Sequence, residues 1–271
     1  MRIAFIGGGN MASALIGGLT RKGYVPQDID VVEVDPAARE RLSSTLGVGV
    51  AQVPGAEVAA ADIVLLAVKP QHLRAVASAV QPLLSAQLVV SIAAGIRAAD
   101  LSRWLRGYGL IVRAMPNTPA LVLAGASVLF AMPSVTDAQR SAAQGILGAV
   151  GSTLWVDREE LMDAATAVSG SGPAYVLYFI EALERAALEL GLLPAQARQL
   201  SLDTFLGAVR LAQGASEEPA VLRARVTSKG GTTERAIRCM EEAGVNQSVV
   251  QAVKQAAQRS RELGDDLGRV E

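Results

Sequence analysis

The chain has 271 residues, of which 51% are hydrophobic and 4% aromatic. This length allows two domains, with cores built mainly from small aliphatic side chains. A formal net charge of −1 gives no electrostatic reason to expect binding to nucleic acid or to an anionic membrane. Cys239 is the only cysteine, and the uncharged stretch over residues 114–132 contains Pro116 and Pro119. No signal peptide pattern opens the chain, so we expect a cytoplasmic protein without a disulfide or a membrane span.

The first twelve residues contain a short apolar strand, a glycine turn and the start of a helix. Gly7, Gly9 and Ala12 fit the dinucleotide fingerprint G-x-G-x-x-G/A, which needs a tight turn, close backbone approach to a pyrophosphate, and close helix–strand packing. The N–H groups at the helix N-terminus would then face the phosphates. The predicted phosphate-binding segment is Ile6, Gly7, Gly8, Gly9, Asn10, Met11 and Ala12.

The N-terminal half alternates between strand and helix patterns. Strands are predicted at 3–6, 29–34, 63–68, 88–92, 110–113, 127–130 and 153–156. Helices are predicted at 11–21, 37–46, 71–84, 98–105 and 137–150. Most strands are apolar on both faces, as buried parallel strands are. The alternation predicts an α/β fold, with a doubly wound Rossmann-type domain over residues 1–157.

The C-terminal half has only helical patterns, which predict an all-α domain over residues 158–271. The helices are expected at 159–167, 174–190, 195–213, 220–226, 233–242 and 248–263. The helix after Ser171-Gly172-Pro173 is apolar on almost every side, so it must be buried on most sides. A small domain provides too little cover for such a helix, which favours an oligomer interface. A central helix within one monomer remains the alternative.

Few side chains are available for chemistry. His72 is the only histidine and Cys239 the only cysteine, which excludes a Ser-His-Asp triad and any metal site rich in these residues. We therefore expect no metal, and we expect a bound nucleotide to supply the reactivity. Hydride transfer suits such a site because it requires orientation more than a strong nucleophile.

Further candidate cofactor contacts follow the predicted strands, where this fold binds ligands. They are Glu33, Ala67, Val68, Lys69, Pro70, Ala93, Ala94, Gly95 and Asn117. Glu33 lies about twenty residues beyond the fingerprint, where an acid binds a ribose 2′-OH. A solvent-facing acid at a strand end is the alternative for Glu33, and ordinary loops are the alternative for the other segments.

One candidate substrate site lies in the helical half. Gly230 and Gly231 precede a helix that begins with Thr232 and Thr233. Such a turn exposes successive N–H groups, and the helix dipole adds positive potential. This combination suits a carboxylate, although an ordinary capped turn has the same pattern.

At these residues the chain resembles pyrroline-5-carboxylate reductase over nearly its whole length. The motifs are FIGGGNMA at 5–12, AVKP at 67–70, VSIAAG at 90–95, RAMPNTPA at 113–120, VSGSGPAY at 168–175 and the pattern over 219–237. The resemblance implies reduction of Δ1-pyrroline-5-carboxylate to L-proline by NADH or NADPH. It also implies an interlocked homodimer, often assembled into decamers of five dimers.

The resemblance further implies roles for single residues. The substrate carboxylate would meet Gly230, Gly231 and Thr232, and the hydroxyl of Thr233 would face the ring nitrogen as the catalytic group. Glu217 or Glu218 would match an acid that contributes in some members.

The chain differs from the family pattern at two places, and two other functions remain as alternatives. Lys229 stands where many members have proline, and Glu33 and Asp35 stand where NADP-preferring relatives often have Ser, Asn or Arg. The acids predict that NADH works at least as well as NADPH, unless Arg39 or Arg41 reaches a 2′-phosphate. A β-hydroxyacid dehydrogenase would need a lysine in the helix after Gly172, where none occurs before residue 185. A non-catalytic NAD(P) sensor that acts as a dimer is the other alternative.

Overall fold

The structure is a computed structural model that describes residues 1–269. The chain forms two compact units. The first contains Met1–Ser171 together with the residues from Gln255 onward, and the second contains Gly172–Lys254. The first unit extends beyond residue 157, where the sequence analysis expects the boundary between the two domains. That domain boundary stays a prediction.

The first unit is built on an eight-stranded sheet with the order β3-β2-β1-β4-β5-β6-β7-β8. The strands are β1 Ile3–Ile6, β2 Ile29–Val32, β3 Gly49–Ala51, β4 Ile63–Leu66, β5 Leu88–Ser91, β6 Ile111–Met115, β7 Gly125–Ala131 and β8 Gly151–Trp155. All neighbours pair in parallel except β6 and β7, which are antiparallel. The central strands are apolar and buried on both faces, as the sequence pattern indicated.

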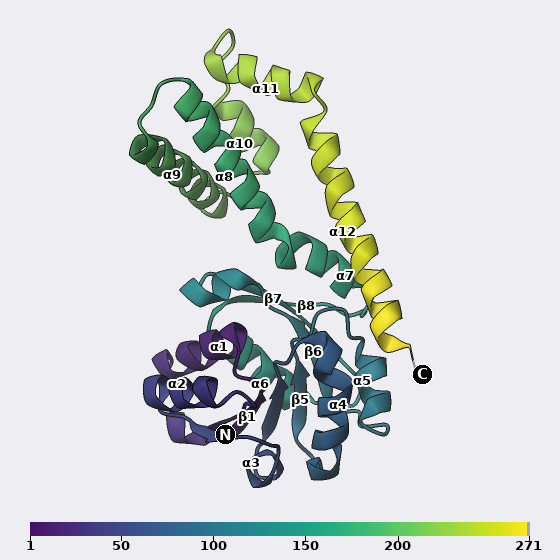
Figure 1. The fold of residues 1–271 in the computed structure, drawn as a ribbon. Helices are drawn as coiled ribbons and strands as arrows, with labels where there is room; N and C mark the ends of the chain where they lie inside the picture. The colour runs from purple at the N-terminus through teal and green to yellow at the C-terminus, as the bar shows by residue number, and fades with distance from the viewer. Residues whose placement is uncertain (270–271) are drawn as a thin grey trace. The chain divides into compact units, whose positions relative to one another are not determined.

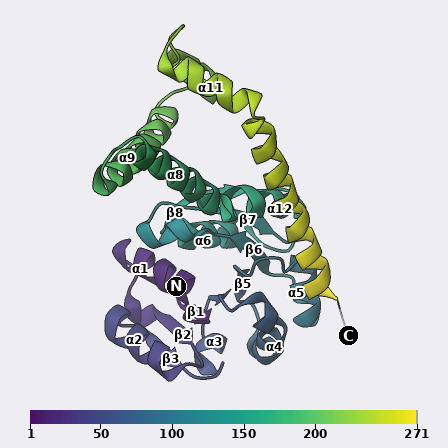
Figure 2. The same ribbon diagram turned by 45° about the horizontal axis from the view of Figure 1, so that its top comes forward.

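Helices cover both faces of this sheet (Figure 1; Figure 2). The helices of the first unit are α1 Asn10–Arg21, α2 Pro36–Leu46, α3 Ala56–Ala59, α4 Pro70–Val80, α5 Ala98–Trp104, α6 Asp137–Leu147 and α7 Leu161–Ala165. Short 3₁₀ turns occur at η1 Pro26–Asp28, η2 Gln81–Leu83 and η3 Thr118–Val122. Helices α1, α2 and α6 share one apolar core with the sheet, and α3, α4 and α5 share the other. The predicted doubly wound α/β architecture is thus confirmed.

Local sequence signals explain where the helices around the sheet begin. The Asp35 side chain caps α2 by accepting the N–H of Ala37 at 3.2 Å, and Pro36 opens the helix. Thr136 and Gln139 form a reciprocal capping box at the start of α6. Most predicted helix limits therefore differ from the structure by only a few residues.

One helix departs from its prediction. Residues 159–167 were expected to form a single α-helix, but α7 is followed by a π-helical turn, η4, from Thr166 to Gly170. The N–H of Ser171 donates to the Thr166 carbonyl at 2.8 Å. A Cβ on Gly170 would lie 2.7 Å from Cε of Met115, so a larger residue there would require the Met115 side chain to move. Side-chain periodicity cannot show such a local change of winding, which is frequent at functional sites.

The second unit is entirely helical, as the sequence predicted. Its helices are α8 Gly172–Glu189, α9 Pro194–Gln213, α10 Pro219–Arg225, α11 Thr232–Glu242 and the first part of α12 Val245–Gly268. Helices α8 and α9 pack against each other. No residue of α8 is buried within the chain, although the helix is largely apolar. Within residues 1–269, no helix has both the length and the hydrophobicity needed to cross a membrane.

Candidate dinucleotide and carboxylate sites

The glycine turn lies at the topological switch point of the sheet. Strand β1 sits between β2 and β4, so the chain leaves it in opposite directions and opens a crevice at the carboxyl ends of the strands. Gly7 has a φ of 99°, and a Cβ there would lie 2.9 Å from the Ala67 carbonyl oxygen. A Cβ on Gly9 would meet no atom within 4 Å, and no side chain caps α1 at this residue. The turn therefore leaves open space in front of a helix N-terminus, which fits a pyrophosphate.

Glu33 follows β2 and supports this turn directly. Its carboxylate accepts the N–H of Gly8 at 2.8 Å and the N–H of Asp35 at 2.9 Å. The Arg39 side chain returns to the same loop, where Nη1 donates to the carbonyls of Glu33 at 2.7 Å and Val34 at 2.9 Å. Glu33 thus lies in the loop after β2 and the Arg39 side chain contacts it, and this is the loop that binds the adenosine ribose in Rossmann folds generally.

An apolar pocket of about 270 Å³ adjoins Glu33. Val34 and Val53 lie in its lining and are 75% and 67% exposed. Large aliphatic side chains in this position form a surface suited to a flat adenine ring. The pocket, the acid and the glycine turn lie side by side at the carboxyl end of β2.

The remaining predicted cofactor residues follow β4 and β5. Ala67, Val68 and Lys69 follow β4, and Pro70 is the first residue of α4. Ala93, Ala94 and Gly95 follow β5, where Gly95 has a φ of 77°. The N–H of Ile92 donates to the Leu66 carbonyl at 3.1 Å, which holds the two strand ends side by side. The structure therefore brings most of the predicted cofactor residues to one edge of the sheet.

Asn117 follows β6, but its side chain is already used. It is 8% exposed, its Nδ2 donates to the Ser169 carbonyl at 2.9 Å, and its Oδ1 accepts the N–H of Ala126 at 2.8 Å. Asn117 thus fastens the loop after β6 to the π-helical turn. Direct contact between Asn117 and a cofactor stays a prediction.

The Gly-Gly turn lies in the second unit, at the start of α11. Gly230 has a φ of 76°, and no side chain caps α11 at Gly231. The N–H of Gly230 donates to Oε2 of Glu234 at 2.6 Å, while the N–H of Gly231 donates to the Ser228 carbonyl at 3.0 Å. A carboxylate of the chain itself therefore occupies one N–H of the turn. The sequence analysis did not predict this role of Glu234, because the contact with Gly230 forms only in the folded turn.

The other predicted substrate residues lie close to this turn in sequence. Thr232 and Thr233 form the start of α11, and the Thr233 residue is half-buried. Glu217 pairs with Arg225 of α10 at 2.6 Å, and Glu218 is the N-cap residue of α10 without a side-chain cap bond. The ion pair favours an anchoring role for Glu217 within the unit, and its contact with substrate remains a prediction.

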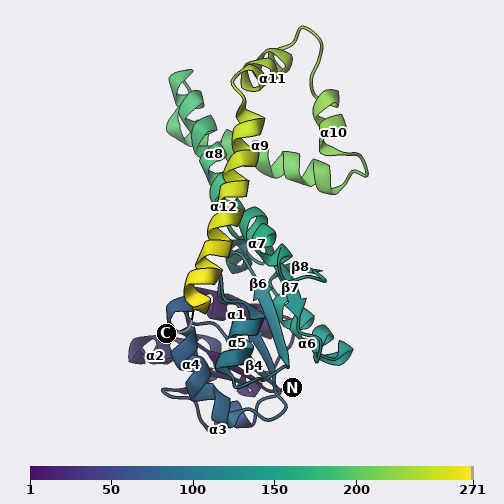
Figure 3. The ribbon, with the colours of Figure 1, turned by 90° about the vertical axis from the view of Figure 1, so that its right-hand side faces the viewer.

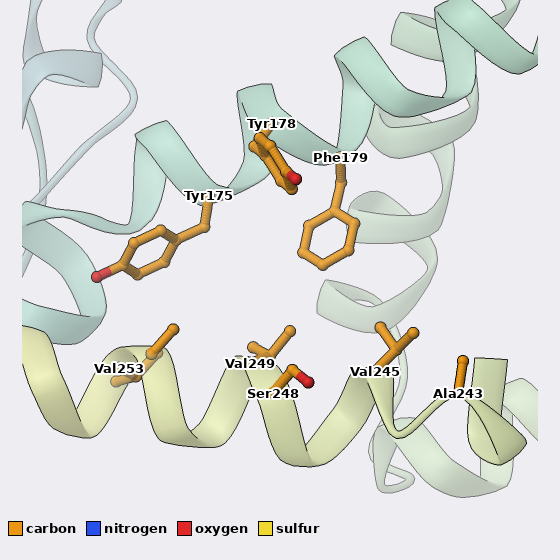
Figure 4. A pocket seen from close by; sticks show the side chains of 9 residues that line it. Tyr175, Tyr178, Phe179, Ala243, Val245, Ser248, Val249 and Val253 are labelled. Carbon is orange, nitrogen blue, oxygen red and sulfur yellow. The ribbon is translucent and has the colours of Figure 1, made fainter.

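A separate apolar groove of about 320 Å³ runs between α8 and the first part of α12. Figure 4 shows Tyr175 and Phe179 pointing from α8 toward valines of α12, which include Val249 and Val253. Tyr178 beside them is 70% exposed. The residues that line this groove have no charged side chain, and their only polar side-chain groups are hydroxyls. The groove therefore suits packing against another surface rather than catalysis.

The cradle at the glycine turn, the acid after β2 and the carboxylate-binding turn define the chain as a Rossmann-fold, dinucleotide-dependent oxidoreductase. Comparison with known proteins identifies the family. Residues 159–263 match the family model for pyrroline-5-carboxylate reductase dimerisation, and residues 2–95 match that for NADP oxidoreductase, coenzyme F420-dependent.

The similarity extends over whole chains. A pyrroline-5-carboxylate reductase of Pseudomonas aeruginosa is 46% identical over 99% of this chain and 98% of its own. The solved structure of a pyrroline-5-carboxylate reductase from Coxiella burnetii is 40% identical, covers 97% of this chain and 98% of its own, and has a TM-score of 0.91. A Plasmodium falciparum pyrroline carboxylate reductase with NADP bound is 27% identical over 97% of this chain and 98% of its own, with a TM-score of 0.87. The chain belongs to the pyrroline-5-carboxylate reductase family.

Proposed function

We propose that the protein reduces Δ1-pyrroline-5-carboxylate to L-proline with NADH or NADPH, as the last step of proline biosynthesis. The observation that carries this proposal is the presence of two sites in one family member of full length. One is a dinucleotide cradle at the switch point of the sheet, and the other is a Gly-Gly turn at the start of α11, where the Gly230 N–H already binds a carboxylate, that of Glu234.

The first unit would hold the dinucleotide. Its pyrophosphate would lie against the turn from Gly7 to Gly9, and the adenosine ribose would lie against Glu33. The loops after β4 and β5 would hold the nicotinamide half. When bound, the cofactor supplies the hydride.

The second unit would hold the substrate carboxylate at the N–H groups of Gly230, Gly231 and Thr232. In the structure Glu234 accepts the Gly230 N–H and the Ser228 carbonyl accepts the Gly231 N–H, so substrate would have to replace both internal acceptors. The half-buried Thr233 would then stand one residue further along and direct its hydroxyl to the ring nitrogen.

The chain's own residues would not need to supply a strong acid. A protonated cyclic imine is already electrophilic, so orientation of the ring and stabilisation of its nitrogen are sufficient. This agrees with a chain that has one histidine and one cysteine.

We further propose that residues 158–271 form the substrate-binding and dimerisation domain. The groove between α8 and α12 lies within the segment matched by the dimerisation model, and exposed Tyr178 and Leu177 need cover. A homodimer would provide that cover, and five dimers would make the decamer expected from the family resemblance. A single cysteine is consistent with the cytoplasm as its location.

A spectrophotometric assay tests the activity. Pyrroline-5-carboxylate should cause oxidation of NADH and NADPH by the purified protein, with proline as the product. Turnover of a β-hydroxyacid with NAD⁺ but not of the imine would favour the dehydrogenase alternative. Binding of NADH without turnover of either substrate would favour the sensor.

A further inference from the structure

The last turns of α12 pack directly on the loop that follows β5. Residues 255–268 of this helix belong to the first unit, and they lie beside α5 (Figure 1; Figure 3). A Cβ on Gly264 would lie 3.0 Å from the Gly95 carbonyl oxygen. A Cβ on Gly95 would lie 3.4 Å from the Leu263 Cβ and 3.7 Å from the Gly264 nitrogen. The helix and the loop are therefore in close contact, and the tightest position is Gly264.

Polar contacts fix the helix in this position along its axis. Asp265 pairs with Arg97 at 2.6 Å, just after the loop. The Gly268 carbonyl accepts from Arg103 of α5 at 2.7 Å, and the Ser260 hydroxyl bonds to Asp163 of α7 at 2.6 Å. These three contacts are spread over the helix from residue 260 to residue 268, so a shift by one turn would break all of them.

An apolar side chain of α12 also contacts the loop after β5. Leu267 packs against the core shared with α4 and α5, and its Cδ1 would lie 3.6 Å from a Cβ on Gly95. The helix thus covers the outer side of the loop with both backbone and side chain. None of the residues from 255 to 268 is among the proposed cofactor contacts, and the contact between the helix and these residues is the one with the loop after β5.

This loop faces one half of the dinucleotide. Glu33 and the apolar pocket beside it place the adenosine half on the β2 side of the switch point. The loop after β5 lies on the opposite side of β1, beyond β4. A displacement of the loop would therefore disturb the nicotinamide half and leave the adenosine half in place.

We infer that the C-terminal turns of α12 set the position of the loop Ala93–Ala94–Gly95, and that Gly264 is a positioning residue for the nicotinamide half of the cofactor. This inference rests on the proposed function. Dinucleotide binding and hydride transfer then depend on a helix that makes no contact with the cofactor itself.

Two ligands separate this role from a general effect on folding. NADH contains both halves of the dinucleotide, whereas ADP-ribose lacks the nicotinamide. Gly264→Ala would push the added methyl group against the Gly95 carbonyl. We expect its Kd for NADH to rise about fivefold, since small displacements of a binding group are costly, while its Kd for ADP-ribose stays within about twofold of wild type.

The matched control is Gly145→Ala. Gly145 is also a glycine within a helix of the first unit, but it is exposed and its Cβ would only come within 4.0 Å of the Tyr24 hydroxyl. Because alanine favours helix at both positions, neither variant should lose stability through helix propensity. Gly145→Ala should bind both ligands as wild type does.

Calorimetric titration of the full-length protein decides the question, and thermal unfolding verifies that each variant is folded. If Gly264→Ala does not fold, Leu267→Ala loosens the same contact from the other side and should show the same selective loss of NADH affinity. Unchanged NADH affinity in the folded variant would overturn the inference, as would an equal loss for NADH and ADP-ribose. A wild-type protein that binds neither NADH nor NADPH would instead overturn the proposed function, and the inference with it.

Discussion

Glu33 should decide which dinucleotide the enzyme prefers. Its carboxylate stands at the end of β2 and accepts N–H groups from Gly8 and Asp35. A 2′-phosphate would bring a second negative charge to this carboxylate, whereas a free 2′-OH could donate a hydrogen bond to it. Arg39 opposes this preference because its guanidinium is anchored on the same loop. We predict that wild-type protein uses NADH at least as well as NADPH.

The variant Glu33→Gln removes the charge and keeps the bond to the glycine turn. Its amide oxygen can still accept the Gly8 N–H, whereas its amide nitrogen cannot accept the Asp35 N–H, so one of the two bonds of Glu33 is lost. Two unit charges about 4 Å apart repel by about 1 kcal/mol in bulk water and about 4 kcal/mol at an effective dielectric constant of 20. Glu33 is half-buried, so we expect a value toward the lower end of this range. A change of about 1.4 kcal/mol corresponds to a tenfold shift of the kcat/KM ratio toward NADPH.

The assay compares kcat/KM for NADH and NADPH in parallel. Asp35→Asn is the matched control, because it removes the same charge two residues away and asparagine can still cap α2. It should shift the ratio much less. Arg39→Gln should shift the ratio toward NADH. A ratio unmoved by Glu33→Gln would show that Glu33 does not face the ribose, and a wild-type preference for NADPH above about tenfold would show that Arg39 outweighs the acid.

Four further predictions address the substrate turn, the cradle, the assembly and alkaline stability. Thr233→Ala should lower kcat/KM for the imine by an amount equivalent to about 1–3 kcal/mol, while the Kd for NADH stays constant; equal turnover in a steady-state assay would reject the role. Gly7→Ala should abolish measurable NADH binding by calorimetry, because its φ is 99° and its Cβ would meet the Ala67 carbonyl at 2.9 Å; retained affinity would contradict the proposed cradle. Light scattering at micromolar concentration should find an oligomer, and Tyr178→Glu should dissociate it; an active wild-type monomer would exclude the groove as an essential interface. Burial raises the pKa of Tyr108, whose hydroxyl donates to the Gln87 carbonyl at 2.6 Å. Its contribution to stability is therefore present below about pH 10 and is lost as the pH rises through the raised pKa. Alkaline unfolding of Tyr108→Phe should be less steep over that range, and identical curves would mean that Tyr108 does not contribute.

Local sequence determined much of this protein. The order of strands and helices follows from apolar periodicity, and the starts of α2 and α6 follow from the cap residues Asp35 and Thr136. The fingerprint from Gly7 to Ala12 defined the dinucleotide turn, because its requirements are met within a few adjacent residues. The Gly-Gly turn before α11 could be predicted because it too is formed by a few adjacent residues.

Other features depend on partners that sequence patterns do not reveal. Strand β3 is short and only half-buried, so it has no strong apolar signal. The antiparallel direction of β7 follows from its connection to β6, and no residue type specifies it. The π-helical turn before α8 likewise has no sign in the side-chain periodicity of residues 159–170.

The candidate site residues also divide into features that the sequence predicts and contacts that only the folded chain shows. Residue types placed Glu33 and Asn117 at strand ends, but only the folded chain shows that Glu33 supports Gly8 and that Asn117 is held by Ser169. The contact between Gly264 and Gly95 joins a C-terminal helix to a loop of the sheet, and neither segment alone carries a sign of the other. Sequence therefore determined the elements and the chemistry of their ends, because these depend on neighbouring residues. Tertiary structure decided which distant backbones and side chains meet, because close packing depends on the shape of both surfaces at once.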